Sequence, residues 1–230
     1  MGAPPVASDR AGSGTRSPAA SPLATLLPGG RVRAGTAVSA GGDMPLLLAL
    51  AAEASRGAAG WAAVGLPQLG VLAAEAAGLE LAHGMRIDTP GRQWAQVLAT
   101  VLEAVPVVVT GSLDAVPDRV ARRLAAVMRR SGSVLLSAGG WQGAEVRLRV
   151  VVSSWEGVGQ GHGLLRARRV TVAAAGRGAA VAPRYAEMWL PGPNGAIAPV
   201  GQEASGGPLA VPATPAVRAV GGRAGLRVVG

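Results

Sequence analysis

Short apolar runs alternate with helical patterns through the middle of this chain. Val105–Thr110 (VPVVVT) is an almost continuous β-branched run, which is typical of a strand buried on both faces. Pro117–Arg130 follows it and carries apolar residues at helical spacing. These apolar positions are Val120, Leu124, Val127 and Met128. Because parallel strands need a crossover connection, usually a helix, the alternation predicts an α/β fold with a mainly parallel sheet flanked by helices.

The same alternation extends from residue 36 to residue 136. Strands are expected at Thr36–Ser39, Trp61–Gly65, Met85–Ile87, Val105–Thr110 and Ser133–Leu136. Helices are expected at Pro45–Arg56, Leu69–Ala77, Arg92–Leu102 and Pro117–Arg130. Pro45 suits the first turn of its helix, where a missing N–H leaves no partner unsatisfied.

After Gly140 the apolar period changes to two. Val146, Leu148, Val150 and Val152 alternate with other residues, as in a strand with one buried face. We therefore expect antiparallel strands at Ala144–Trp155, Arg166–Ala174 and Tyr185–Leu190. The glycine-rich stretch Trp155–Gly163 is interpreted as a hairpin loop anchored by Trp155, the alternative being a phosphate-binding loop.

Composition divides the chain into three parts. Residues 1–20 and 201–230 are rich in Ala, Pro, Ser and Gly and lack periodicity, so they are expected to be a disordered arm and a flexible C-terminal arm around a core domain of residues 21–200. The last arm holds apolar residues, Leu226 and Val228 among them, that either order on binding a partner or belong to a passive tail.

Charge and composition restrict the chemistry. All 22 basic residues are Arg, the net charge is +9, and the chain has no Cys and two His. Disulfides and thiolate metal sites are excluded, a zinc site is not expected, and no lysine can contact a phosphate. No apolar run reaches the length of a membrane span and the N-terminus lacks a signal-peptide pattern, so we expect a cytoplasmic protein with no membrane contact.

The stretch Val38–Leu50 (VSAGGDMPLLLAL) has the outline of a phosphate-binding loop. Ser39, Gly41, Gly42 and Asp43 lie between a strand and a helix, where backbone N–H groups can surround phosphate oxygens. The Lys and the Ser or Thr that complete such a loop are missing. Asp43 would repel a triphosphate and Pro45 lacks an N–H. The stretch is an unusual nucleotide site, the remains of one, or an ordinary turn.

Several segments in order resemble the RecA-type ATPase core between Leu23 and Gly192. These segments are Gly29-Gly30-Arg31, VSAGGDMPLLLAL, GLPQLG, VPVVVT, VLLS and AEMWLPG. The late stretches WEGVGQGHGLLRARRVTVAAAGRG and PRYAEMWLPG are similar to the shortened RecA-like proteins of actinobacterial inducible-mutagenesis cassettes, the ImuA type. The resemblance implies a RecA-like P-loop core that ends in an antiparallel β meander.

Three catalytic positions of the RecA type are empty in this chain. The phosphate-loop Lys is replaced near Asp43, Gly65–Gln68 holds no acidic residue, and the first carboxylate after Thr110 is Asp114. We therefore expect no ATP hydrolysis and no cofactor. The resemblance implies a non-catalytic adaptor in translesion synthesis that assembles with a Y-family polymerase-like protein and an error-prone replicative polymerase. The alternative is a divergent ATP-binding protein that acts as a nucleotide switch or DNA-dependent ATPase.

Arginines supply the candidate contact surfaces. Arg122 and Arg123 lie on the expected helix Pro117–Arg130, and Arg166 and Arg168 lie on a strand of the meander. Both groups could contact a partner or bind DNA weakly and without sequence specificity. The alternatives are a solvated helix face for the first group and protection of a sheet edge for the second.

Overall fold

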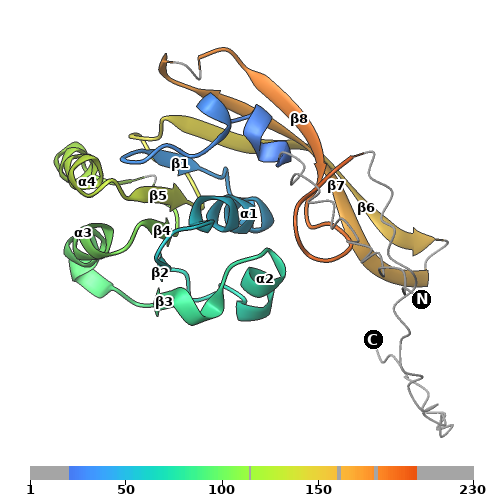
Figure 1. Cartoon of the computed structure of the whole chain (residues 1–230), viewed down its shortest axis with the longest axis horizontal. Coiled ribbons are helices and arrows are strands. Elements are labelled where there is room, and N and C mark those ends of the chain that lie inside the picture. The colour runs from blue at the N-terminus through green and yellow to red at the C-terminus, as the bar shows by residue number, and fades with distance from the viewer. Residues whose placement is uncertain (1–20, 114, 160–161, 179–180, 201–230) are drawn as a thin grey trace, which may run out of the picture.

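The computed structural model describes residues 21–200 except 114, 160–161 and 179–180. These residues form a nine-stranded sheet in the order β3-β2-β4-β5-β1-β6-β7-β8-β9 (Figure 1). All neighbours from β3 to β6 pair in parallel, and those from β6 to β9 pair antiparallel. The strands are β1 Ala37–Ser39, β2 Trp61–Val64, β3 Gly84–Ile87, β4 Val107–Thr110, β5 Val134–Ser137, β6 Val146–Gly159, β7 His162–Gly176, β8 Arg184–Trp189 and β9 Ala198–Pro199.

Helices cover both faces of the parallel strands. The α-helices are α1 Met44–Ser55, α2 Val71–Ala76, α3 Trp94–Ala104 and α4 Asp118–Ser131, and short 3-10 turns are η1 Pro22–Thr25, η2 Pro28–Gly30, η3 Leu81–His83 and η4 Gly91–Gln93. Figure 1 shows α1 and α2 on one side of the sheet and α3 and α4 on the other. The predicted α/β class, with parallel strands followed by antiparallel ones, is confirmed. Within the described residues, no helix combines the length and the apolar character needed to cross a bilayer.

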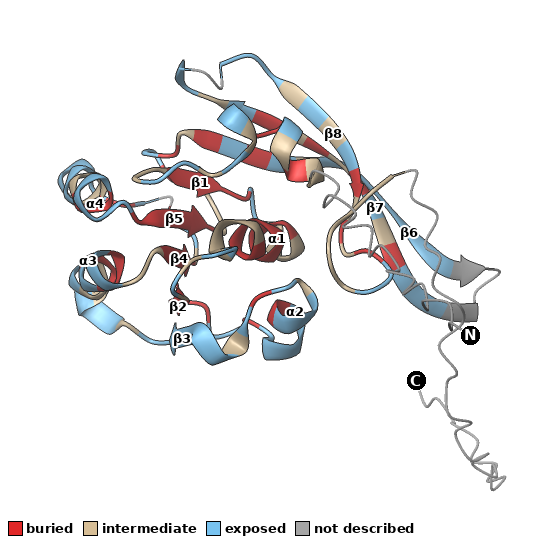
Figure 2. Cartoon of the chain, in the orientation of Figure 1, coloured by how far each residue is buried: buried red, intermediate tan, exposed pale blue. Residues whose placement is uncertain are grey.

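The central strands are buried on both faces, as expected for a parallel sheet between two helix layers. Val108 and Leu135 pack with α3 and α4, whereas Val109 and Leu136 pack with α1. Figure 2 shows this buried layer along β1, β4 and β5. The predicted burial of VPVVVT is confirmed for Val107–Thr110, which form β4, whereas Val105 and Pro106 precede the strand and are half-buried.

Helix α1 is apolar around its whole circumference. Every residue from Leu46 to Ala52 is buried. A helix of this kind must be surrounded by other elements, and α1 lies in the core cluster that also contains residues of η1 and β6 to β8. Asp43 caps its N-terminus, and Pro45 lies in its first turn as predicted. The start of α1 is thereby placed at the carboxyl edge of β1.

The meander differs from the sequence-based expectation in two respects. A β-bulge between Val150 and Val152 breaks the alternation, so Val152 is 61% exposed instead of buried. The expected loop Trp155–Gly163 is instead mostly strand, because β6 runs to Gly159 and β7 starts at His162. Trp155 therefore pairs with Arg168 within the sheet and does not anchor a loop.

Two helices also begin later than expected. The expected helix Leu69–Ala77 is observed as α2, with Gly70 as its N-cap. In the expected helix Arg92–Leu102, the first two residues belong to the 3-10 turn η4, and α3 continues to Ala104. Such end positions depend on capping geometry that periodicity does not report.

Candidate functional site

The connection between β1 and α1 is a four-residue turn, Ala40–Asp43. The Asp43 N–H donates to the Ala40 carbonyl oxygen at 3.2 Å. Gly41 and Gly42 have φ values of 61° and 90°, which are those of the central residues of a type I′ turn. A Cβ on Gly41 would lie 2.5 Å from the Leu148 carbonyl oxygen of β6. The glycines are thus explained by turn geometry and by close packing against β6.

Several backbone donors around this turn are bonded within the chain. The Ala40 N–H donates to the Ser137 carbonyl oxygen at 2.9 Å, and the Gly42 N–H donates to the Ala138 carbonyl oxygen at 2.6 Å. The Leu47 N–H donates to the Asp43 carbonyl oxygen at 3.0 Å. A phosphate-binding loop works because such N–H groups point toward the ligand. Here these three donors already have acceptors.

The Asp43 carboxylate lies directly on the N-terminus of α1. Its Oδ1 accepts a hydrogen bond from the Leu46 N–H at 2.9 Å, and its Oδ2 lies 2.6 Å from Nη1 of Arg168. Because a helix N-terminus carries partial positive charge, an anion at this point is stabilised. The chain supplies that anion itself, at the place where a bound phosphate would interact with the helix.

Arg168 completes a nearly buried ion pair with Asp43. The side chains of Arg168 and Asp43 are 14% and 12% exposed. The Arg168 Nε also donates to the Ser153 Oγ at 2.8 Å. The contact joins residues 125 positions apart and fastens the β6–β7 hairpin to the start of α1. Sequence analysis singled out both residues but assigned them to separate surfaces.

A shallow hollow of about 340 Å³ lies over this ion pair. It is bounded by the turn residues Gly41, Gly42 and Asp43, by Arg168, and by residues 150–153 of β6. The carboxylate and the guanidinium in its wall neutralise each other. The arrangement therefore offers structural linkage and no unpaired cation for a phosphate.

Hydroxyl groups at the same edge of the sheet bond to backbone carbonyls. Ser39 is buried, and its Oγ donates to the Gly139 carbonyl oxygen at 2.6 Å. Ser137 donates to the same oxygen at 3.0 Å. Ser39 thus holds the segment after β5 against β1. Asp114, the first carboxylate after Thr110, lies outside the described residues.

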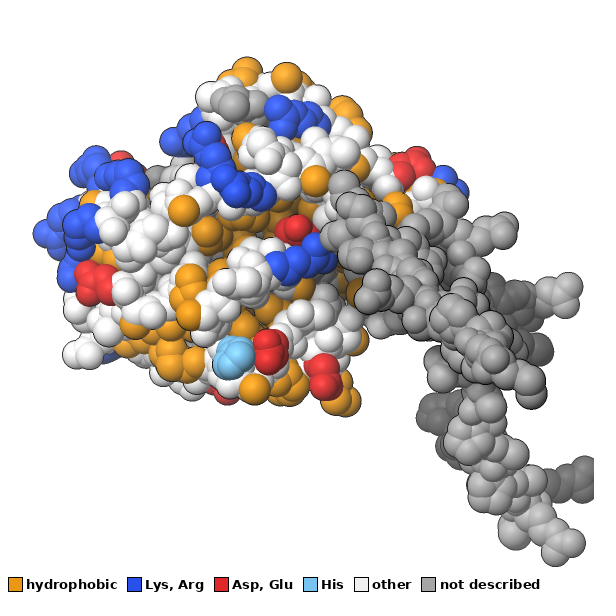
Figure 3. All heavy atoms as spheres, viewed as in Figure 1, with side chains coloured by type: hydrophobic (Ala, Val, Ile, Leu, Met, Phe, Trp, Pro, Cys, Tyr) orange, Lys and Arg blue, Asp and Glu red, His pale blue; other side chains and the backbone are white. Residues whose placement is uncertain are grey.

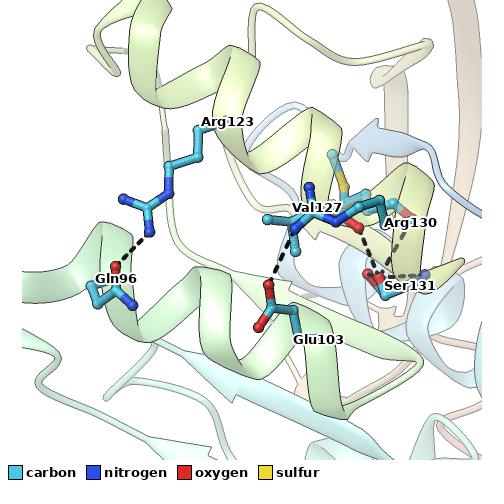
Figure 4. Close-up of polar contacts among 8 residues, drawn as sticks. Gln96, Glu103, Arg123, Val127, Arg130 and Ser131 are labelled. Carbon is cyan, nitrogen blue, oxygen red and sulfur yellow. Dashed lines mark hydrogen bonds and ion pairs between the residues drawn. The ribbon is translucent and has the colours of Figure 1, made fainter.

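Arg122 and Arg123 are exposed on α4, as predicted. The Arg123 Nη2 donates to the Gln96 Oε1 of α3 at 2.7 Å, and Arg130 pairs with Glu103 of α3 at 3.3 Å (Figure 4). Two of the helix's arginines therefore link α4 to α3. Figure 3 shows the basic side chains gathered over α4.

Of the remaining predicted contact residues, one is exposed, one is bonded inside the chain and two lie outside the described residues. Arg166 is exposed on β7, whereas the Arg168 guanidinium is engaged inside the chain as described above. Leu226 and Val228 lie outside the described residues. Their proposed role in partner contact stays a prediction.

A group of exposed apolar side chains on the outer half of the β6–β7 hairpin could not be predicted from the sequence. Its side chains are exposed, to 49% for Trp155 and 73% for Leu164. We call this set the hairpin patch: Val151, Val152, Trp155, Leu164 and Leu165. The alternating pattern could not locate it, because two bulges shift the side chains between faces.

Comparison with known proteins places this chain in a family. Residues 25–143 match the MT3502 N-terminal domain. The chain belongs to the MT3502 N-terminal domain family. The matched range includes β1 to β5 and α1 to α4, and β6 to β9 follow it.

This chain is similar to the uncharacterized protein Rv3395c of Mycobacterium tuberculosis. The two are 33% identical over 135 residues, which make up 57% of this chain and 66% of the relative. The chain thus spans slightly less than two thirds of the length of that protein.

The ion pair predicts that Arg168 contributes far more than the neighbouring Arg169 to the free energy of unfolding. We expect Arg168→Ala to lower the free energy of unfolding by about 3 kcal/mol, because it leaves the buried Asp43 carboxylate without its cation. Arg169→Ala is the control: Arg169 pairs with Glu187 with side chains 47% and 52% exposed, so the loss should stay below about 1 kcal/mol. Urea denaturation measures both. Equal losses would contradict the structural role of Arg168.

Replacing the two turn glycines, Gly41 and Gly42, should also lower stability by different amounts. Gly42→Ala introduces only the strain of positive φ, about 1 to 2 kcal/mol, because a Cβ there meets nothing within 4 Å. Gly41→Ala adds a collision with the Leu148 carbonyl oxygen and should cost more. Thermal unfolding compares the two variants. A Gly41→Ala variant as stable as Gly42→Ala would show that β6 does not constrain the turn.

Proposed function

We propose that this protein is a non-catalytic adaptor built on a RecA-like P-loop core, and that it acts in DNA-damage-induced mutagenesis in the cytoplasm. The observation that carries the proposal is the Asp43–Arg168 ion pair at the N-terminus of α1. A strand, a glycine turn and a helix remain where the RecA-type resemblance places nucleotide binding. At that position the charged side chains of Asp43 and Arg168 bind each other, which favours a structural role over ATP hydrolysis.

A triphosphate would meet several obstacles at this turn. It would have to displace the Asp43 carboxylate from the helix N-terminus or accept repulsion from it. It would also need donors that now bond to Ser137 and Ala138. The Ser or Thr that would hold magnesium in such a loop is missing after the turn. Each of these changes opposes nucleotide binding.

The hairpin patch supports the docking part of the proposal. Exposed Trp and Leu side chains grouped on a projecting hairpin are the kind of anchor found at protein interfaces. The RecA-type resemblance suggests its partners: a Y-family polymerase-like protein and an error-prone replicative polymerase. The adaptor would hold these proteins together through the meander while the parallel sheet serves as scaffold.

Whether the protein binds ATP is tested by titration with fluorescent ATP and magnesium. We expect no saturable binding in the micromolar range. The control is Gly42→Leu, whose side chain enters open space over the turn and would block a bound phosphate. Micromolar binding that Gly42→Leu abolishes would contradict the proposal and favour a nucleotide switch.

Docking is tested by capture of the purified polymerase-like partner on the immobilised full chain. We expect Trp155→Ala combined with Leu164→Ala to reduce the retained partner at least tenfold, because two anchors are removed. The matched control is Val71→Ala combined with Leu72→Ala, which removes exposed apolar side chains from α2. Equal retention by both double variants would exclude the hairpin patch, and no retention by the unmodified chain would overturn the adaptor proposal.

A further inference from the structure

One face of the meander has no helix over it. Val146, Leu148, Val170 and Met188 point to the side of α1 and are buried. Side chains that alternate with them point to the side of α3 and α4, yet those helices pack on other strands. We call the second side of β6 to β8 the open face. The charged and aromatic residues of this face used below are Arg147, Arg149, Arg169, Tyr185, Glu187 and Trp189.

The open face carries cations that no carboxylate matches. Arg147 and Arg149 are exposed on β6, and Arg177 follows β7 at the margin of the face. Arg147 and Arg177 both donate to the Gln142 carbonyl oxygen, which leaves their charge in place. Among the residues that the structure describes, none of these three arginines forms an ion pair. Only Arg169 is neutralised, by Glu187.

Aromatic rings lie beside these cations on the same face. Pairing places Arg149 opposite Ala173, and Ala173 opposite Tyr185, so these three residues form one row across three strands. Neighbouring strands are about 4.8 Å apart, so Tyr185 lies roughly 10 Å from Arg149. The small Ala173 between them leaves Tyr185 accessible, and Tyr185 is 66% exposed. Trp189 lies four residues further along β8 on the same side.

We propose that the open face binds single-stranded nucleic acid. Arg147, Arg149 and Arg177 contact backbone phosphates, and Tyr185 stacks on an unpaired base, with Trp189 positioned for a second base. Charge complementarity favours a polyanion, and an exposed ring on the same face as the cations favours unpaired bases over a duplex, whose bases already stack on each other. The inference does not depend on the adaptor proposal, because none of the residues that carry it belongs to the hairpin patch.

The test is fluorescence anisotropy of a labelled oligothymidylate of about 20 nucleotides with the full chain, at about 50 mM and 200 mM salt. We expect Arg147→Glu combined with Arg149→Glu to weaken binding at least tenfold. The slope of log affinity against log salt should fall by about 1.4, since each lost phosphate contact on a single strand contributes about 0.7. The matched control is Arg119→Glu combined with Arg129→Glu on α4, two exposed residues whose replacement changes the net charge equally and should alter affinity less than twofold.

Tyr185 variants test stacking separately from charge. Tyr185→Ala should weaken binding roughly fivefold or more, whereas Tyr185→Phe should bind like the unmodified chain because the ring remains. A duplex of the same length should bind more weakly than the single strand. Circular dichroism should show every variant folded, since these side chains are exposed.

Three results would overturn the proposal. These are unchanged affinity in the Arg147/Arg149 variant, an equal loss in the α4 variant, and tighter binding of the duplex than of the single strand. If the Arg147/Arg149 variant keeps its affinity for DNA but loses the polymerase-like protein in the capture assay, the open face contacts an acidic protein surface instead.

Discussion

The Asp43–Arg168 ion pair connects the two halves of the sheet. Asp43 belongs to the turn between β1 and α1, and Arg168 belongs to the antiparallel hairpin, so the contact holds the meander against the parallel core. The pair is almost buried, which makes each charge depend on the other. Ser153 and the Leu46 N–H complete the hydrogen bonding. This contact adds to the β1–β6 pairing and to the shared core in holding the hairpin beside α1.

The same pair explains how a helix N-terminus can remain stable without a bound anion. In a phosphate-binding loop the ligand satisfies the N–H groups and the positive end of the helix. Here the Asp43 carboxylate meets the helix, and the carbonyl oxygens of Ser137 and Ala138 accept from the turn. A strand-turn-helix unit built in this way is stabilised by groups of the chain itself.

The meander separates its two sides chemically. The side toward α1 joins the core, whereas the open face carries unmatched arginines and the exposed ring of Tyr185. Beyond the bulge at Val150, apolar side chains such as Val152 and Trp155 become exposed on the outer hairpin. The meander thus carries an apolar group of side chains on its outer hairpin and a basic and aromatic group on its open face.

The sequence by itself determined the α/β class and the order of elements, because the periods of two and 3.6 residues arise from local backbone geometry. VPVVVT, the apolar face of α4 and the proline in the first turn of α1 were all recognisable in this way. It also showed that the chain contains no lysine. Only the tertiary structure decided that Arg168 pairs with Asp43 and that Val152 is exposed. The first is a contact between distant residues and the second follows from a bulge, and neither leaves a periodic trace in the sequence.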